Sequence, residues 1–223
     1  MLRNEALEDI TDGKKYGIND MVKAGTGGCA GCSKCCETMA DTIVLSPYDI
    51  WNLEIGTGNS FDRMVDKIIE LKVHDGIILP NMKSNNGICV MLSAGRCIVH
   101  KNRPDFCRLF PLGRLYEGDR FTYVLQTNQC DKAPVKVKVK KWIDTPDYDY
   151  YADYIVKWHG IIREVAKIAA DPSADKEMSR KMLTTLLTLF YQQSYKGKDF
   201  FYEFDRRTAV FSETFLNTSQ DKA

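Results

Sequence analysis

Half of the cysteines in this chain fall within one run of eight residues. The run is Cys29-Ala30-Gly31-Cys32-Ser33-Lys34-Cys35-Cys36, which has the pattern C-x2-C-x2-C-C. A two-residue gap lets one tight turn bring two thiolates onto the same ion, as in zinc sites. Successive gaps of two residues also occur in the ligand runs of iron–sulfur proteins. The spacing therefore predicts a metal centre and leaves the metal open.

The other four cysteines lie downstream of this run. Together the eight thiols could supply one centre with spare thiols, or two centres with four ligands each. We predict as metal ligands Cys29, Cys32, Cys35, Cys36, Cys89, Cys97, Cys107 and Cys130.

The adjacent pair Cys35 and Cys36 bears on the number of centres. In an extended backbone the two side chains would point to opposite sides, with Cα atoms about 3.8 Å apart. On that geometry one ion would rarely bind both thiols. The pair therefore favours two neighbouring centres, and a single centre with several bystander thiols stays open as the competing model.

Cations gather beside Cys97 and Cys107, where Asp105 is the acid that opposes them. Nearby cations favour the thiolate form, and guanidinium groups can donate hydrogen bonds to sulfur or to carbonyls that orient the ligands. We predict that Arg103 and Arg108 support the cofactor in this way. The alternative is that both arginines form ordinary surface ion pairs.

The three histidines are weaker candidates. His100 lies three residues after Cys97, so it is an open candidate for a nitrogen ligand. His74 and His159 are isolated in the sequence, and we interpret them as structural or surface residues.

Composition limits the partners and the compartment. The chain has 31 Lys and Arg against 30 Asp and Glu, so its charge of +1 gives no general field for nucleic acid. Lys136, Lys138 and Lys140 alternate with valines, a pattern that is more typical of a solvated strand face than of a nucleic-acid site. No apolar run approaches the ~20 residues that span a bilayer, and the first residues do not resemble a signal peptide.

We therefore expect a cytoplasmic protein without a membrane partner, which acts with an unidentified protein or redox partner. In a reducing compartment, clustered cysteines are more often metal-binding or catalytic than disulfide-bonded.

The expected fold is α+β and mostly α, with an irregular cysteine-rich part, short strands and a C-terminal helical hairpin. We predict a loosely ordered leader over residues 1–28, a metal-binding domain over 29–145 and a helical region over 146–223. We detect no internal repeat.

Several elements of the middle region can be predicted. Thr42 to Leu45 is β-rich and predicts a short strand. Ser46-Pro47-Tyr48-Asp49 predicts a helix start, with an end near Gly56 to Gly58. A second helix, capped by Ser60, is expected from about Phe61 to Val73. Residues 76–99 should form short strands or loops, residues 112–126 a hairpin around Glu117-Gly118-Asp119, and residues 135–140 a half-exposed strand.

The C-terminal region has the periodicity of long helices. Apolar residues from Tyr148 to Ala169 recur every three or four positions, and Asp171-Pro172 should end that helix. A second helix, capped by Ser173, should run to about Gly197 and pair antiparallel with the first. We expect residues 217–223 to be disordered.

Roughly residues 29–131 resemble a known family. The octet is followed by Cys89, Cys97, Arg103-Pro104, Cys107-Arg108, Phe110-Pro111 and Cys130. This order and spacing resemble the YkgJ-like cysteine-cluster family, whose CxxCxxCC domains are described as zinc- or iron-chelating. The chain departs from the family at Ser33, where glycine is common, and at His100, where an aromatic residue is usual. The resemblance implies metal chelation by the cysteines.

A more distant resemblance, to the cysteine motif of flagellin lysine N-methylase, implies an iron–sulfur centre in a protein-lysine methyltransferase. The chain lacks a convincing glycine-rich S-adenosylmethionine loop, so this is an alternative only. The main prediction is an iron–sulfur centre of the [4Fe–4S] type, with a role in electron transfer, sensing or maturation. The other alternative is a zinc ion that staples a binding module. The sequence makes no prediction on catalysis.

Overall fold

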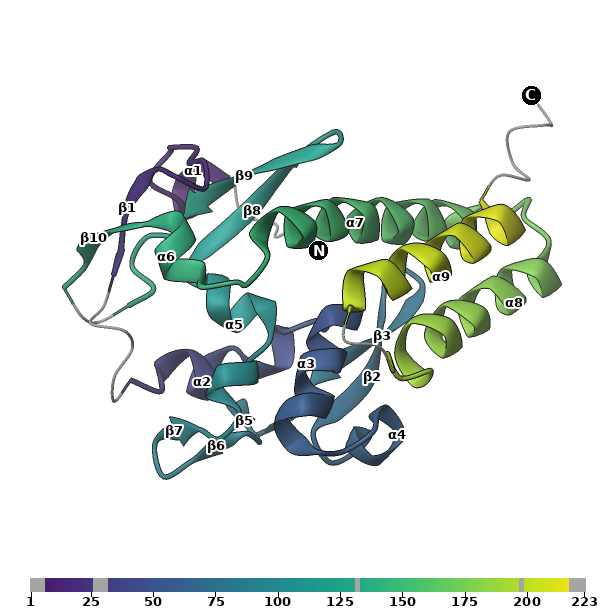
Figure 1. Cartoon of the computed structure of the whole chain (residues 1–223), viewed down its shortest axis with the longest axis horizontal. Helices are drawn as coiled ribbons and strands as arrows, with labels where there is room; N and C mark the ends of the chain where they lie inside the picture. The colour runs from purple at the N-terminus through teal and green to yellow at the C-terminus, as the bar shows by residue number, and fades with distance from the viewer. Residues whose placement is uncertain (1–6, 26–31, 131–132, 197–198, 217–223) are drawn as a thin grey trace.

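The computed structural model describes residues 7–25, 32–130, 133–196 and 199–216 (Figure 1). The fold is α+β and mostly α, as predicted. Its helices are α1 (Leu7–Ile10), α2 (Lys34–Thr38), α3 (Pro47–Thr57), α4 (Phe61–Met64), α5 (Asp105–Leu109), α6 (Val139–Ile143), α7 (Tyr148–Ala170), α8 (Lys176–Leu187) and α9 (Phe200–Phe215). Short 3-10 turns cover Ala40–Thr42 and His100–Asn102, and a π-helical turn covers Thr188–Gln192.

The strands pair in antiparallel twos. The pairs are β1 (Met21–Gly25) with β10 (Val135–Lys138), β2 (Ile69–His74) with β3 (Ile77–Met82), β4 (Ser84–Asn85) with β5 (Ile88–Cys89), β6 (Leu92–Ser93) with β7 (Arg96–Cys97), and β8 (Leu112–Glu117) with β9 (Arg120–Leu125). The predicted short strands over 76–99 and the predicted hairpin over 112–126 are confirmed. The strand predicted over 135–140 ends at Lys138, where α6 begins.

Helix α3 begins and ends as predicted. The Ser46 side chain accepts from the Asp49 backbone N–H, and the Asp49 carboxylate accepts from the Ser46 backbone N–H, so the start is a complete capping box. Gly58 closes the helix in the left-handed conformation, with φ of 67°.

The helix predicted from Phe61 to Val73 is wrong beyond Met64. Asp66 takes a positive φ of 62°, which breaks the helix, and Ile69–His74 then pairs with β3. The turn residues Asp75 and Gly76 both have positive φ, which suits a two-residue hairpin. The strand predicted over 42–45 is also wrong, because Val44 makes a single bridge to Asn81 after a 3-10 turn. At residues 69–74 tertiary pairing overrides the local helical pattern, whereas at residues 42–45 the pairing is limited to one bridge.

The described part of the predicted leader is not loosely ordered. Strand β1 pairs with β10, and Thr11 and Tyr16 form bridges to Gln126 and Tyr123. Val22 and Ala24 are buried in a small second core beside β8 and α6. The leader packs because its alternating apolar residues have a distant strand to pair with, which local composition does not reveal. The division into three regions remains a prediction.

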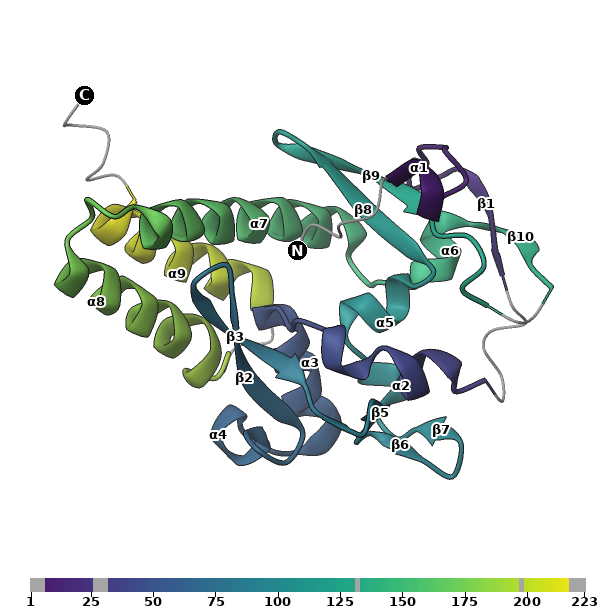
Figure 2. The ribbon, with the colours of Figure 1, turned by 180° about the vertical axis from the view of Figure 1, so that it is seen from behind.

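The C-terminal helices form the hairpin that the periodicity predicts, with α8 and α9 both alongside α7 (Figures 1 and 2). Helix α8 is capped by Asp175 rather than Ser173, and its backbone leaves helical form after Gln192. Helix α9 was not predicted as a separate element. The disorder expected for 217–223 concerns residues outside the described ranges. No helix in the described ranges is long and apolar enough to cross a membrane.

One large core joins the C-terminal helices to the middle of the chain. Its centre is aromatic: Tyr48 of α3 packs against Tyr154 and Phe200, and Tyr154 meets Phe204 edge-on at 4.6 Å between ring centroids. Cys89 belongs to this core, and Cys36, Cys97 and Cys107 pack against it. The cysteine-bearing elements α2, β5 and β7 thus gather at one end of the molecule, away from α8 (Figure 2).

Candidate metal centre

Helix α2 carries Cys35 and Cys36, so the adjacent thiols do not lie on an extended backbone. Ser33 precedes the helix, and its carbonyl accepts from the backbone N–H groups of Cys36 and Glu37. Both thiols line one small cavity, and the Cys36 thiol donates a hydrogen bond to the Cys35 sulfur. The expectation that the pair points apart is therefore wrong, because it assumed strand geometry. The geometric argument for two centres falls with it.

Two consecutive hairpins present Cys89 and Cys97. In the first, Cys89 pairs with Ser84 across the turn Asn86-Gly87; in the second, Cys97 pairs with Leu92 across the turn Ala94-Gly95. All four turn residues have positive φ, at 52°, 83°, 49° and 73° in chain order, which is the pattern of a two-residue I′ turn. Each cysteine therefore occupies the same place in its hairpin.

Sequence analysis missed this recurrence. Its signal is a glycine two residues before each cysteine, Gly87 before Cys89 and Gly95 before Cys97, in turns that lie eight positions apart. The backbone after each turn also behaves alike. The backbone N–H of Met91 acts to lower the pKa of Cys89, and the backbone N–H of Val99 acts in the same way on Cys97. A donor near the sulfur favours the thiolate, the form that binds metal.

Helix α5 carries the fifth thiol, Cys107, between two aromatic side chains. Phe106 and Phe110 stack with ring centroids 6.1 Å apart, and both line the cavity together with Cys107. The Trp142 indole N–H holds the end of α5 by donating to the Leu109 carbonyl at 3.1 Å. The Cys107 thiol is thus fixed by the packing of its helix.

The thiols meet around a cavity of about 20 Å³. Its lining has sulfur and apolar groups: Cys35, Cys36, Cys89, Cys107, Met39, Ile43, Phe106 and Phe110. Cys97 lies beside it, close enough that its charge acts on Cys89 and Cys107. In the described ranges no group of three or more His, Cys, Asp or Glu side chains is already arranged to hold an ion. Five thiols from three separate stretches are nevertheless neighbours, and no disulfide joins them.

The protonation of these thiols differs from one to the next. The hydrogen bond from Cys36 lowers the pKa of Cys35 to about 6, and the charge of Arg103 acts in the same direction. Donating that hydrogen bond raises the pKa of Cys36. Burial raises the pKa of Cys89 and Cys97, and that of Cys107 well above its usual value. Metal binding must therefore displace protons from most of the thiols.

The two predicted arginines differ in position. The charge of Arg103 acts on Cys35 and Cys97, and its guanidinium donates to the His100 carbonyl at 2.8 Å. Arg108 is turned away and donates to the carbonyls of Lys101 and Asp144. Arg103 therefore lies within electrostatic reach of the thiols, and Arg108 ties α5 to its neighbouring loops.

The histidines do not line the cavity. The imidazole of His74 shares a hydrogen bond with the Asn81 side chain at 2.7 Å, and His159 stacks on Tyr116 at 3.7 Å between ring centroids. Both contacts agree with the interpretation of His74 and His159 as structural or surface residues. Burial and the charges of three arginines lower the pKa of His100, whose backbone carbonyl is the acceptor for Arg103.

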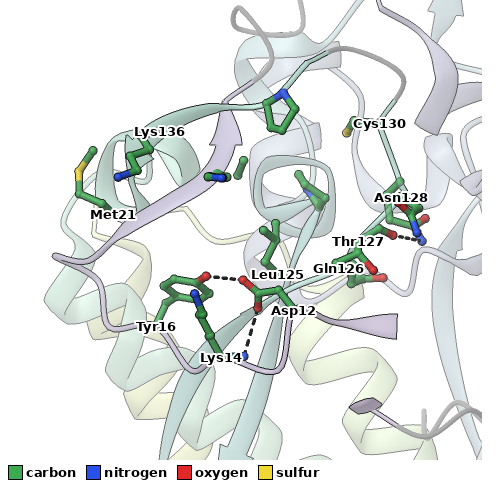
Figure 3. A pocket seen from close by; sticks show the side chains of 15 residues that line it. Asp12, Lys14, Tyr16, Met21, Leu125, Gln126, Thr127, Asn128, Cys130 and Lys136 are labelled. Atoms are coloured by element: carbon green, nitrogen blue, oxygen red, sulfur yellow. Dashed lines mark hydrogen bonds between the residues drawn. The ribbon is translucent and has the colours of Figure 1, made fainter. Parts of the chain in front are cut away.

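The remaining predicted ligands are not brought to this cavity. Cys32 is exposed just before α2, and it is not among the lining residues. Cys130 is exposed at a different pocket, between β1 and the end of β9 (Figure 3). Cys29 lies outside the described residues. The structure thus assembles Cys35, Cys36, Cys89, Cys97 and Cys107.

A buried polar network fixes α5 relative to the rest of the fold. The Asp49 carboxylate, which caps α3, also accepts from the Asp105 backbone N–H at 2.7 Å. The Asp105 carboxylate pairs with both terminal nitrogens of Arg114, at 2.5 and 2.9 Å, and Arg114 donates to the Tyr151 hydroxyl at 2.7 Å. The helix that carries Cys107 is therefore linked to α3, β8 and α7. Sequence analysis had interpreted Asp105 as opposing the local surface cations.

Residues 28–134 match the model of the CxxCxxCC family, which is described as a "Putative zinc- or iron-chelating domain". This part of the chain is therefore similar to the CxxCxxCC family. The matched range includes every cysteine of the cavity, so the resemblance inferred from the spacing is confirmed. No curated protein and no solved structure matches the chain. Metal chelation is thus the activity that family and site have in common.

Proposed function

We propose that the cavity thiols hold an iron–sulfur centre of the [4Fe–4S] type. The observation that carries the proposal is that Cys35, Cys36, Cys89 and Cys107 line one apolar cavity, with Cys97 close enough for its charge to act on Cys107. An iron–sulfur cluster takes cysteine thiolates as its usual ligands, and four of these five would suffice once the thiols move apart, because the cavity of about 20 Å³ is close to the size of one water molecule. When bound, the cluster would supply one-electron redox chemistry, with a potential set by burial and by hydrogen bonds to sulfur.

The cysteine spacing supports iron–sulfur over zinc, because successive gaps of two residues are the pattern of iron–sulfur ligand runs. The cavity lining within the described residues contains no histidine or carboxylate, so its donors are thiols alone, which suits an iron–sulfur cluster and also a tetrathiolate zinc ion. The surrounding Met39, Ile43, Phe106 and Phe110 limit the access of water, which otherwise promotes loss of a cluster.

Zinc is the second candidate because one observation favours it. The paired hairpins place Cys89 and Cys97 at the same position after turns of the same type. A tetrathiolate zinc ion would be held by such turns equally well. In that case the metal would staple α2, α5 and the hairpins into a binding module without redox chemistry.

The test is elemental analysis of protein purified without oxygen, together with its visible spectrum. The proposal predicts about four iron and four sulfide per chain and broad charge-transfer absorption, as the cluster formula requires. About one zinc per chain, with no iron and no visible colour, would establish the zinc interpretation instead. Purification from iron-rich and from zinc-rich cultures shows whether the dominant metal is merely the more abundant one.

Single substitutions locate the centre. Cys89→Ser and Cys107→Ser should lose most of the bound metal, because each removes a thiol of the cavity. Cys130→Ser is the matched control, since Cys130 is exposed at another pocket and should be dispensable. Equal metal loss in all three variants would contradict the placement of the site.

A further inference from the structure

A second pocket shares no lining residue with the thiol cavity, and none of the assignments above uses it. Its volume is about 590 Å³, within the range of small-molecule sites. Three segments form it: residues 12–16, strand β1 with strand β10, and residues 125–130 after β9. Figure 3 shows Lys136 and Met21 on one wall, and Gln126, Thr127 and Asn128 on the other.

The pocket is cationic because three of its lining residues are lysines. Lys14 comes from the loop after α1, Lys23 from β1 and Lys136 from β10. Within the described ranges none of the three forms an ion pair, whereas Lys15, next to Lys14, is paired with Glu117. Three like charges around one hollow repel one another, and an anion bound between them would relieve that repulsion.

The single acidic residue in the lining does not neutralise these lysines. Asp12 accepts the Tyr16 hydroxyl on one carboxylate oxygen and the Lys14 backbone N–H, at 3.2 Å, on the other (Figure 3). Its carboxylate is therefore engaged by its own loop. The lining as a whole keeps an excess of positive charge.

The other lining groups suit the uncharged parts of a ligand. Residues 126–129 are all polar, with amide and hydroxyl side chains, and their backbone is anchored where Gln126 and Thr127 donate to the Pro111 and Ile10 carbonyls. Leu125 and Ala24 add apolar surface to the pocket. Such a lining can bind oxygen acceptors at one end and a carbon skeleton at the other.

We propose that this pocket binds a small phosphate monoester. Three lysine ammonium groups around one hollow suit a phosphate monoester, which carries about 1.5 to 2 negative charges near neutral pH, better than a carboxylate, which carries one. A nucleic-acid strand would need a charged track with stacking aromatic rings. Here the lining aromatic residue is Tyr16, whose hydroxyl is held by Asp12.

The test is calorimetric titration of the full, metal-loaded chain with phenyl phosphate at low ionic strength. Phenyl phosphate should bind, inorganic phosphate more weakly, and phenylacetate least. Lys23→Gln and Lys136→Gln should each weaken phenyl phosphate about two- to fivefold, the range expected for one exposed charge contact. The triple variant with Lys14→Gln should reduce binding by at least about tenfold.

The matched controls are Lys15→Gln and Lys138→Gln. Lys15 follows Lys14, and Lys138 follows Lys136 on β10, but neither lines the pocket. Both controls should bind phenyl phosphate as the native chain does. Equal weakening by pocket and control variants, or no binding by the native chain, would overturn the proposal. The proposal would also be overturned if a single-stranded oligonucleotide bound more tightly than phenyl phosphate and if that binding depended on Lys138 as much as on Lys136. The metal content and the visible spectrum are measured on each sample. A loss of phosphate binding with both unchanged concerns the pocket alone, and a change of metal concerns the thiol cavity.

Discussion

The buried ion pair between Arg114 and Asp105 offers a sharp test of how the fold positions the fifth thiol. The side chains are 9% and 13% exposed, and two hydrogen bonds join them. Arg114→Leu would leave the Asp105 carboxylate buried without its cation. Breaking such a pair costs about 3–5 kcal/mol of unfolding free energy. For a chain of this size that corresponds to a fall in melting temperature of about 6–20 °C.

The assay is thermal unfolding of the metal-free chain, followed by circular dichroism. Lys167→Ala is the control, because it breaks the exposed pair with Glu164 and should cost at most about 1 kcal/mol. The double variant Asp105→Asn with Arg114→Leu should recover part of the loss, since no charge is then left unpaired. A loss in Arg114→Leu no larger than in the control would refute the argument.

The same pair predicts a pH dependence. Burial alone would raise the pKa of Asp105, but the charge and hydrogen bonds of Arg114 outweigh it and lower that pKa below the usual 3.8. A carboxyl whose pKa is depressed in the folded state stabilises the fold above its unfolded pKa, and that stability is lost as the pH falls. The difference between native and Arg114→Leu chains should therefore be full at pH 7 and shrink below about pH 4. A difference that stays constant down to pH 3 would contradict this assignment.

Three further outcomes are expected at the thiol cavity. In the metal-free chain, alkylation of Cys35 by iodoacetamide should rise with a midpoint near pH 6, as its pKa of about 6 requires; a midpoint near 9 would contradict the Cys36 hydrogen bond. Gly95→Val should lower metal retention, because its φ of 73° is strained for a β-branched residue; the control Gly160→Ala, in a helix with open space around it, should not. Arg103→Leu should keep the metal but shift its reduction potential or oxygen sensitivity more than Arg108→Leu does, which voltammetry of both variants would measure.

Local signals predicted some elements well. The start of α3 could be predicted because Ser46, Pro47 and Asp49 each act within one turn of the helix. The end of α7 before Pro172 is equally local. By contrast, Ile69–His74 has an apolar pattern that fits either a helix or a strand, and pairing with β3 decided it.

Some features of the candidate site could likewise be predicted from the sequence, and others could not. The cysteine spacing predicted the similarity to a family described as zinc- or iron-chelating, because ligand spacing is a property of the sequence itself. The orientation of Cys35 and Cys36 depends on the backbone, and a helical turn replaced the assumed strand. The partner of Asp105 could not be predicted, since Arg114 reaches it only after β8 has packed beside α5. Long-range pairing of this kind leaves no local signal.

The most direct test of the proposed centre is a comparison of thiol reactivity in metal-loaded and metal-free protein by mass spectrometry. In the loaded chain, Cys35, Cys36, Cys89, Cys97 and Cys107 should resist alkylation together, and removal of the metal should expose them together. Cys130 should react at the same rate in both samples, because it is exposed at the other pocket. Protection of Cys130 along with the five, or labelling of two or more of the five while metal and spectrum stay intact, would contradict a single centre at this cavity.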